Sequence, residues 1–104
     1  MIGIFRSRLR EGAAGYPATA ARMEELVATM PGFLGIKTFR ADDGERVSLF
    51  AFETLEALDA WRDHLEHRAA QRRGRDEFYA EYTLQICAPL REARFVAAGP
   101  ERAG

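Results

Sequence analysis

The chain has 104 residues, the length of a single domain, and 47% of them are hydrophobic, which is ordinary for a globular protein. Fifteen basic and sixteen acidic residues give a net charge of −1, without the basic excess of nucleic-acid-binding domains. No apolar run approaches the ~20 residues of a membrane span, and the single cysteine, Cys87, excludes an internal disulfide and fits a reducing compartment. We therefore expect a cytoplasmic protein that binds neither nucleic acid nor membranes.

The first third of the chain predicts a strand and a helix. Residues 2–10 are expected to form a strand, with Ile2, Ile4, Arg6, Arg8 and Arg10 on one side and Gly3, Phe5, Ser7 and Leu9 on the other. Residues 17–30 carry apolar side chains at the spacing of one helix face: Met23, Leu26, Val27 and Met30. Pro31 and Gly32 follow and are expected to end this helix, because proline cannot continue its hydrogen-bond ladder.

Residues 33–41 and 45–53 predict two strands of a hairpin around Asp42-Asp43-Gly44, since Asp-Gly suits a tight turn. In the second strand Val47 and Leu49 point to one side, and Phe50 and Phe52 to the other. Both faces are therefore apolar. Two helices cover only one face of a sheet, so we expect a second copy of the chain to cover the other in a homodimer.

The second helix is predicted from Thr54, which suits a cap position, to Gly74, which is expected to end it. Its core stripe contains Leu55, Leu58, Trp61 and Leu65, whereas His64, His67 and Gln71 form a separate stripe. A straight helix would place His67 on the opposite side from Leu58. We therefore predict a bend between Arg62 and Glu66, which would let Trp61 and His67 border one cavity, closed by Phe5 or Ser7.

A last strand is predicted over residues 78–89. Residues 91–104 lack periodicity and are expected to form a tail after a domain spanning residues 1–90. The order of elements is β-α-β-β-α-β, which predicts an α+β, ferredoxin-like fold with an antiparallel sheet of strand order 4-1-3-2.

Three segments carry a resemblance to a known family: IGIFRSRL, MPGFLGIKTFRADDGERVSLFAFET and TLEALDAWRDHLEHRAAQ. On the basis of these segments, residues 1 to about 90 resemble the antibiotic biosynthesis monooxygenase superfamily of dimeric α/β-barrel proteins. The resemblance implies that two ferredoxin-like domains form one barrel. It allows three functions, because the superfamily contains cofactor-independent oxygenases that form quinones, haem degraders and proteins with no known activity.

The quinone-forming branch has a Trp in this helix, so the resemblance implies that Trp61 positions an aromatic or polycyclic phenol. His67 lies about where that branch has a tyrosine. A phenol must lose a proton before its ring passes an electron to O₂, and a neutral imidazole is a suitable base. We therefore predict His67 and Trp61 as catalytic, with no cofactor and no metal. The predicted substrate contacts are His64, Gln71, Ser7, Phe5, Arg68 and Arg72.

Two other functions remain open. The haem-degrading branch has an Asn on the first strand and a haem-ligating His ten residues after the Trp, where this chain has Ser7 and Gln71. Gln is not a normal haem-iron ligand, so we expect no haem degradation. The first alternative to the oxygenase, ahead of a haem-binding or haem-degrading protein, is a non-catalytic dimeric domain that binds a small ligand or only assembles. In that case Trp61 is a core residue and both histidines lie on the surface.

Overall fold

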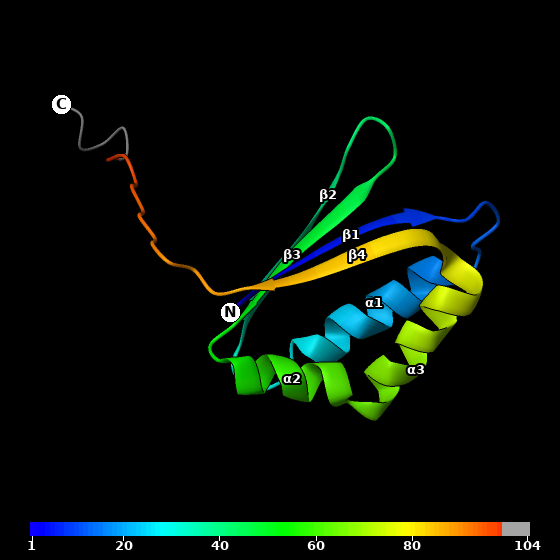
Figure 1. Cartoon of the computed structure of the whole chain (residues 1–104), viewed down its shortest axis with the longest axis horizontal. Coiled ribbons are helices and arrows are strands. Elements are labelled where there is room, and N and C mark those ends of the chain that lie inside the picture. Colours follow the sequence, from blue (N-terminus) through cyan, green and yellow to red (C-terminus); the bar gives the residue numbers. More distant parts are fainter. Residues whose placement is uncertain (99–104) are drawn as a thin grey trace.

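The structure, a computed structural model, describes residues 1–98 and has two layers, a sheet and a set of helices (Figure 1). The sheet is antiparallel with the strand order β2-β3-β1-β4, which is the predicted order read from the other edge. The ferredoxin-like α+β fold is therefore confirmed. The elements in chain order are β1 (Ile2–Leu9), α1 (Tyr16–Val27), β2 (Phe33–Arg40), β3 (Arg46–Phe52), α2 (Leu55–Asp63), α3 (Leu65–Arg73), the short π-helical segment η1 (Gly74–Phe78) and β4 (Tyr79–Cys87).

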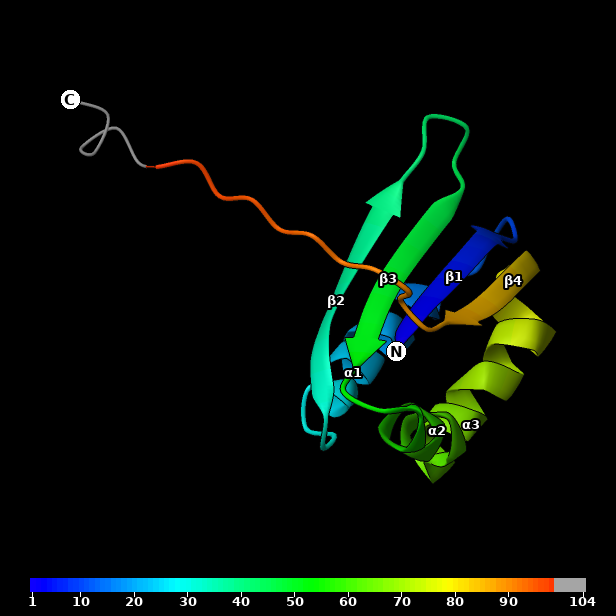
Figure 2. The same cartoon turned by 60° about the vertical axis from the view of Figure 1, so that its left-hand side comes forward.

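All three α-helices lie on one side of the sheet (Figures 1 and 2). In the register of the sheet Phe5 lies opposite Ser48 on one side and Leu84 on the other. These side chains share the face that points to the helices, because neighbours directly across a ladder point the same way. The opposite face, here named the open face, carries Ile4, Leu49 and Phe39; Leu49 is 40% exposed and Phe39 48% exposed. No helix among residues 1–98 covers it.

The core joins β3 to the helices α1 and α2. Phe52 is completely buried and clusters with Val27 of α1 and with Leu58 and Trp61 of α2. The ring of Phe33 meets Phe52 edge to face, with ring centroids 5.5 Å apart. Edge-to-face packing of this kind is favoured by the aromatic quadrupole. The side chains on the helix-facing side of β3 therefore bind the two layers together at this end of the sheet.

The second helix is broken, as predicted between Arg62 and Glu66. Thr54 caps the start of α2, and its hydroxyl accepts a hydrogen bond from the Ala57 N–H at 3.1 Å. His64 leaves the helical conformation, with φ −59° and ψ 131°, and its Nδ1 accepts a hydrogen bond from the Glu66 N–H at 3.2 Å. A ring nitrogen thus takes the capping role of a serine or asparagine oxygen, and α3 starts in a new direction.

One prediction for this segment is wrong, and another holds only for the α-helix itself. Leu65 does not continue the core stripe: it is 80% exposed, because the break at His64 turns the start of α3 away from Leu58. The α-helix ends before Gly74 as predicted, because α3 finishes at Arg73, but Gly74 keeps helical angles and the chain winds on into the π-helical η1. A Cβ on Gly74 would lie 2.6 Å from the ring of Tyr79. This glycine permits close packing, and its φ of −56° is not the left-handed conformation of a usual glycine cap.

After β4 the chain leaves the sheet. Residues 88–98 form neither helix nor strand and extend away from the two layers (Figures 1 and 2). The predicted tail, residues 91–104, is described as far as residue 98, and the rest lies outside the described residues. In the described part of the chain no helix has the length and apolar character needed to cross a bilayer.

Candidate functional site

A cavity of about 370 Å³ lies between the sheet and the helices. Phe5 and Ser7 of β1 form part of its floor, and Trp61 of α2 with His67 and Gln71 of α3 forms part of its wall. The predicted cavity beside Trp61 and His67 is therefore present. The surface of the wall is mostly apolar, as in the usual small-molecule site, and its charged side chains are Glu24, Arg46, Arg62 and Arg75. The remaining lining side chains include Met23 and Val27 of α1, Phe50 of β3, and Tyr79, Tyr82 and Leu84 of β4.

Trp61 and His67 stack on each other. Their ring centroids are 3.9 Å apart and the planes differ by only 12°. His67 Nδ1 lies 2.9 Å from the backbone oxygen of Trp61. A carbonyl oxygen only accepts hydrogen bonds, so Nδ1 carries the proton and donates it. In this tautomer Nε2 keeps a lone pair, and the imidazole can accept a proton there.

Burial sets the charge of His67. Removal from water lowers its pKa below the ordinary value, and the hydrogen bond to the Trp61 carbonyl offsets this only in part. The imidazole is therefore neutral at pH 7. A neutral imidazole with one nitrogen already engaged presents a single proton acceptor, as a general base requires.

The other end of the cavity is formed by Tyr16, Arg46 and Tyr79. The two tyrosine rings meet edge to face with centroids 6.0 Å apart, and the Arg46 guanidinium lies 5.3 Å from the centre of the Tyr16 ring. Burial, with a smaller effect of the neighbouring Tyr16, raises the pKa of Tyr79 well above its usual value. The Tyr79 hydroxyl therefore stays protonated at neutral pH and can donate a hydrogen bond.

The structure brings together five of the predicted site residues and separates three. Phe5, Ser7, Trp61, His67 and Gln71 all line the cavity. His64 does not, because its ring caps α3. Arg68 and Arg72 are exposed on α3 and also lie outside the cavity wall. Arg62 does line the cavity, and it is paired with Asp63 at 3.1 Å.

Sequence reasoning missed Tyr16 and Arg46. Arg46 alternates with Val47 along β3 and so shares a face with Ser48 and Phe50. That alternation could have placed it beneath the helices. Tyr16 lies one residue before the predicted helix start, whereas α1 begins at Tyr16 itself. The Tyr16 ring contacts Tyr79 of β4, which is 63 positions away in sequence, so no local sequence pattern indicated this contact.

Metal binding has no support in the residue arrangement. Across residues 1–98, no group of three or more His, Cys, Asp or Glu side chains is placed to hold a metal ion. The Nδ1 atoms of His64 and His67 both take part in hydrogen bonds to the backbone.

Comparison with known proteins identifies the family. The sequence profile of the antibiotic biosynthesis monooxygenase family matches residues 4–73. The uncharacterized protein YqjZ of Bacillus subtilis (strain 168) is 37% identical over 92 residues, which cover 88% of this chain and 81% of YqjZ. Rv0793 of Mycobacterium tuberculosis has a similar structure, with a TM-score of 0.78, 21% identity and coverage of 89% of this chain and 97% of Rv0793.

SnoaB of Streptomyces nogalater, a cofactor-independent oxygenase, also shares the fold. Its TM-score is 0.67 at 18% identity, and the match covers 88% of this chain and 96% of SnoaB. At such identities these solved structures establish the fold alone. The profile match and the relationship to YqjZ establish the family: the chain belongs to the antibiotic biosynthesis monooxygenase family.

Proposed function

We propose that this protein is a cofactor-independent monooxygenase that oxidises an aromatic or polycyclic phenol with O₂ in the cavity between sheet and helices. The observation that carries the proposal is the stacked pair of Trp61 and His67, in which Nδ1 is occupied and Nε2 is left as the proton acceptor. Similarity in fold to SnoaB, a cofactor-independent oxygenase, supports the same class of reaction.

The chemistry follows from the side chains of the wall. His67 Nε2 takes the phenolic proton, because a phenolate donates an electron to O₂ far more readily than a phenol does. One oxygen atom of O₂ forms the new quinone carbonyl, and the other leaves as water with the two hydrogens lost by the substrate. Tyr16 and Tyr79, which lie at the opposite end of the cavity, supply hydroxyl donors for developing negative charge. The mostly apolar wall excludes water from the reduced oxygen species.

We also propose that the active form is a homodimer that buries the open face. Ile4, Leu49 and Phe39 lie on this face without cover from any helix in the described residues. A stable interface buries on the order of 1,600 Å² in total, and a four-stranded sheet face offers an area of this scale. The cavity lies on the opposite side of the sheet, so dimerisation leaves it accessible.

Oxygen uptake with a panel of hydroxynaphthalenes and anthrones tests the proposed activity. We expect one O₂ consumed per quinone formed, without added metal, flavin or haem. His67→Ala should lower the turnover by ~10²-fold or more, the usual contribution of a general base. Arg72→Ala is the matched control, because Arg72 is exposed on the same helix and lies outside the cavity. Binding of these compounds without oxygen uptake would instead support a non-catalytic ligand-binding domain.

A further inference from the structure

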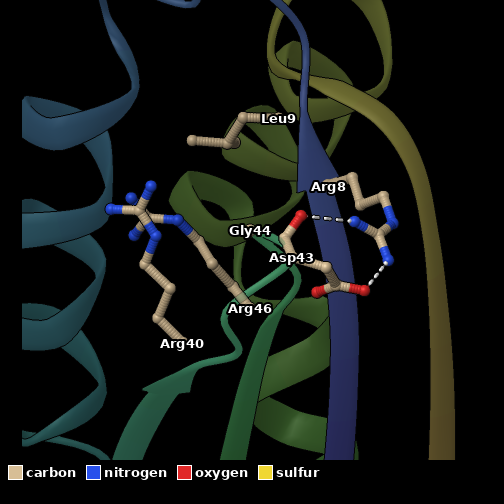
Figure 3. Close-up of a pocket in the computed structure, with 6 residues that line it drawn as sticks. All are labelled: Arg8, Leu9, Arg40, Asp43, Gly44 and Arg46. Carbon is tan, nitrogen blue, oxygen red and sulfur yellow. Dashed lines mark hydrogen bonds and ion pairs between the residues drawn. The ribbon is translucent and has the colours of Figure 1, made fainter.

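Two arginines face each other at the hairpin end of the sheet. Arg40 of β2 and Arg46 of β3 are direct partners across the ladder, so their side chains emerge on the same face. They line a hollow of about 290 Å³ together with Arg8, Leu9, Asp43 and Gly44. Figure 3 shows the two side chains extending toward the same side of the hollow, away from Arg8. Like charges placed directly opposite each other destabilise a sheet unless something neutralises them.

The acidic groups of the hairpin do not neutralise this pair. Asp43 is bound by Arg8, with an N–O distance of 2.7 Å, and Glu45 is bound by Arg6 at 2.9 Å (Figure 3 shows the first pair). In the described part of the chain no carboxylate oxygen lies within 4.0 Å of a nitrogen of Arg40 or Arg46. Two positive charges therefore remain uncompensated on the helix-facing side of the sheet.

Arg46 connects this hollow to the main cavity, because it belongs to both walls. Its guanidinium lies over the ring of Tyr16, which restricts its position by a cation–π contact. Burial keeps the Tyr79 hydroxyl beside Tyr16 protonated, so it can donate a hydrogen bond. A guanidinium has donors and no acceptor, so the group that satisfies Arg46 must be an acceptor, and the Tyr79 hydroxyl can donate to the same group. Carboxylates match the guanidinium fork with two parallel hydrogen bonds.

We propose that the ligand of the main cavity is an aromatic carboxylic acid, whose carboxylate is bound by Arg46 with support from Arg40. The aromatic body lies toward the stacked pair of Trp61 and His67. The aromatic character of the ligand rests on the proposed function, whereas the acidic group is a separate requirement that follows from the arginine pair. The site therefore selects acids over neutral phenols of the same size.

A matched pair of ligands tests this selection. 2-Naphthol and 6-hydroxy-2-naphthoate share one ring system and differ in the carboxylate. Both are titrated anaerobically, and binding is followed by the fluorescence of Trp61, the single tryptophan of the chain. We expect the acid to bind at least ~10-fold more tightly than the naphthol, the usual order of effect for a charge-assisted pair. Equal affinities, or no binding of either compound, would overturn the proposal.

Substitutions assign the preference to the arginines. Arg46→Gln should abolish the preference for the acid, Arg46→Lys should keep part of it, and Arg40→Gln should reduce it. Arg72→Gln should have no effect, since Arg72 is exposed and outside both hollows. Circular dichroism verifies that each variant is folded. Retention of the full preference by Arg46→Gln would overturn the proposal. Loss of oxygen uptake with the preference intact would instead contradict only the oxygenase function, because the binding assay involves no turnover.

Discussion

The imidazole of His67 lies flat on the indole of Trp61, at a centroid distance of 3.9 Å, although six positions separate the two residues in the chain. An uninterrupted α-helix does not bring i and i+6 face to face, because it repeats every 3.6 residues. The break at His64 makes the stack possible, and the hydrogen bond from His67 Nδ1 to the Trp61 carbonyl holds it. Position, tautomer and protonation state of His67 thus depend on one irregular residue between two short helices.

Replacement of Trp61 should damage both stability and the site. Trp61 is 8% exposed and belongs to the core cluster. We expect Trp61→Ala to lower the free energy of unfolding by about 3 kcal/mol, measured by urea denaturation, because a large aromatic ring leaves a cavity behind. Leu65→Ala is the control: Leu65 is 80% exposed, so its loss should cost less than about 0.5 kcal/mol. A small effect of Trp61→Ala would contradict the packing described for α2.

Protonation of His67 should weaken the fold at mildly acidic pH. The folded pKa lies below the unfolded value, so between the two values the unfolded chain binds more protons. The contribution of His67 to the free energy of unfolding is fully present above pH ~6.5, the ordinary histidine pKa. It is lost as the pH falls from this value through the lower pKa of the folded state. The stability difference between wild type and His67→Gln, measured by urea denaturation from pH 8 to pH 5, should therefore shrink toward acid. Parallel stability curves would contradict the burial of the imidazole.

Gly3 should be intolerant of a side chain. A Cβ at this position would lie 2.0 Å from the ring of Phe50, which packs across β1 on the helix-facing side. We expect Gly3→Ala to lower the free energy of unfolding by about 1–3 kcal/mol through overpacking. In the Gly3→Ala, Phe50→Leu double variant the smaller side chain should relieve part of this penalty, so the two substitutions should not be additive. Strict additivity would show that the ring and the glycine do not interact.

The proposed homodimer should depend on the open face. Leu49→Arg places a charge among Ile4, Val47 and Phe39, and we expect it to convert a dimer to a monomer at micromolar concentration in sedimentation velocity. Leu65→Arg adds the same charge on the helical side and should leave the association unchanged. A wild-type protein that is monomeric at this concentration would refute the proposed homodimer.

Haem should not be degraded by this protein. Gln71 lines the cavity where the related haem-degrading proteins carry a ligating His, and amide groups are poor ligands for haem iron. Titration with haem and a reductant should produce no verdohaem-like or biliverdin-like absorption. Gln71→His offers an informative comparison, since a Soret shift restricted to this variant would show that the ligand alone was missing. Release of iron by the wild type would prove the expectation wrong.

Local patterns in the sequence determined most of the fold. Alternation placed Val47 and Leu49 opposite Phe50 and Phe52, and the spacing of Met23, Leu26 and Val27 predicted α1, because each pattern reflects which side of one element is buried. The bend near His64 was also predictable, since the core stripe and the polar stripe of the second helix could not both face the sheet. The family resemblance rests on the same local segments.

Tertiary structure alone added the residues at the other end of the cavity. Tyr16, Arg46 and Tyr79 come from three distant parts of the chain and meet only when β4 closes the sheet beside β1. The exposure of Leu65 and the close packing of Gly74 against Tyr79 followed from the new direction of α3, which propensity does not encode. Arg40 and Arg46 became an uncompensated pair because the register of β2 and β3 placed them opposite each other, while Arg6 and Arg8 bound the nearby acids. Contacts between residues far apart in sequence depend on register and layer packing, and no local pattern of residues specifies these.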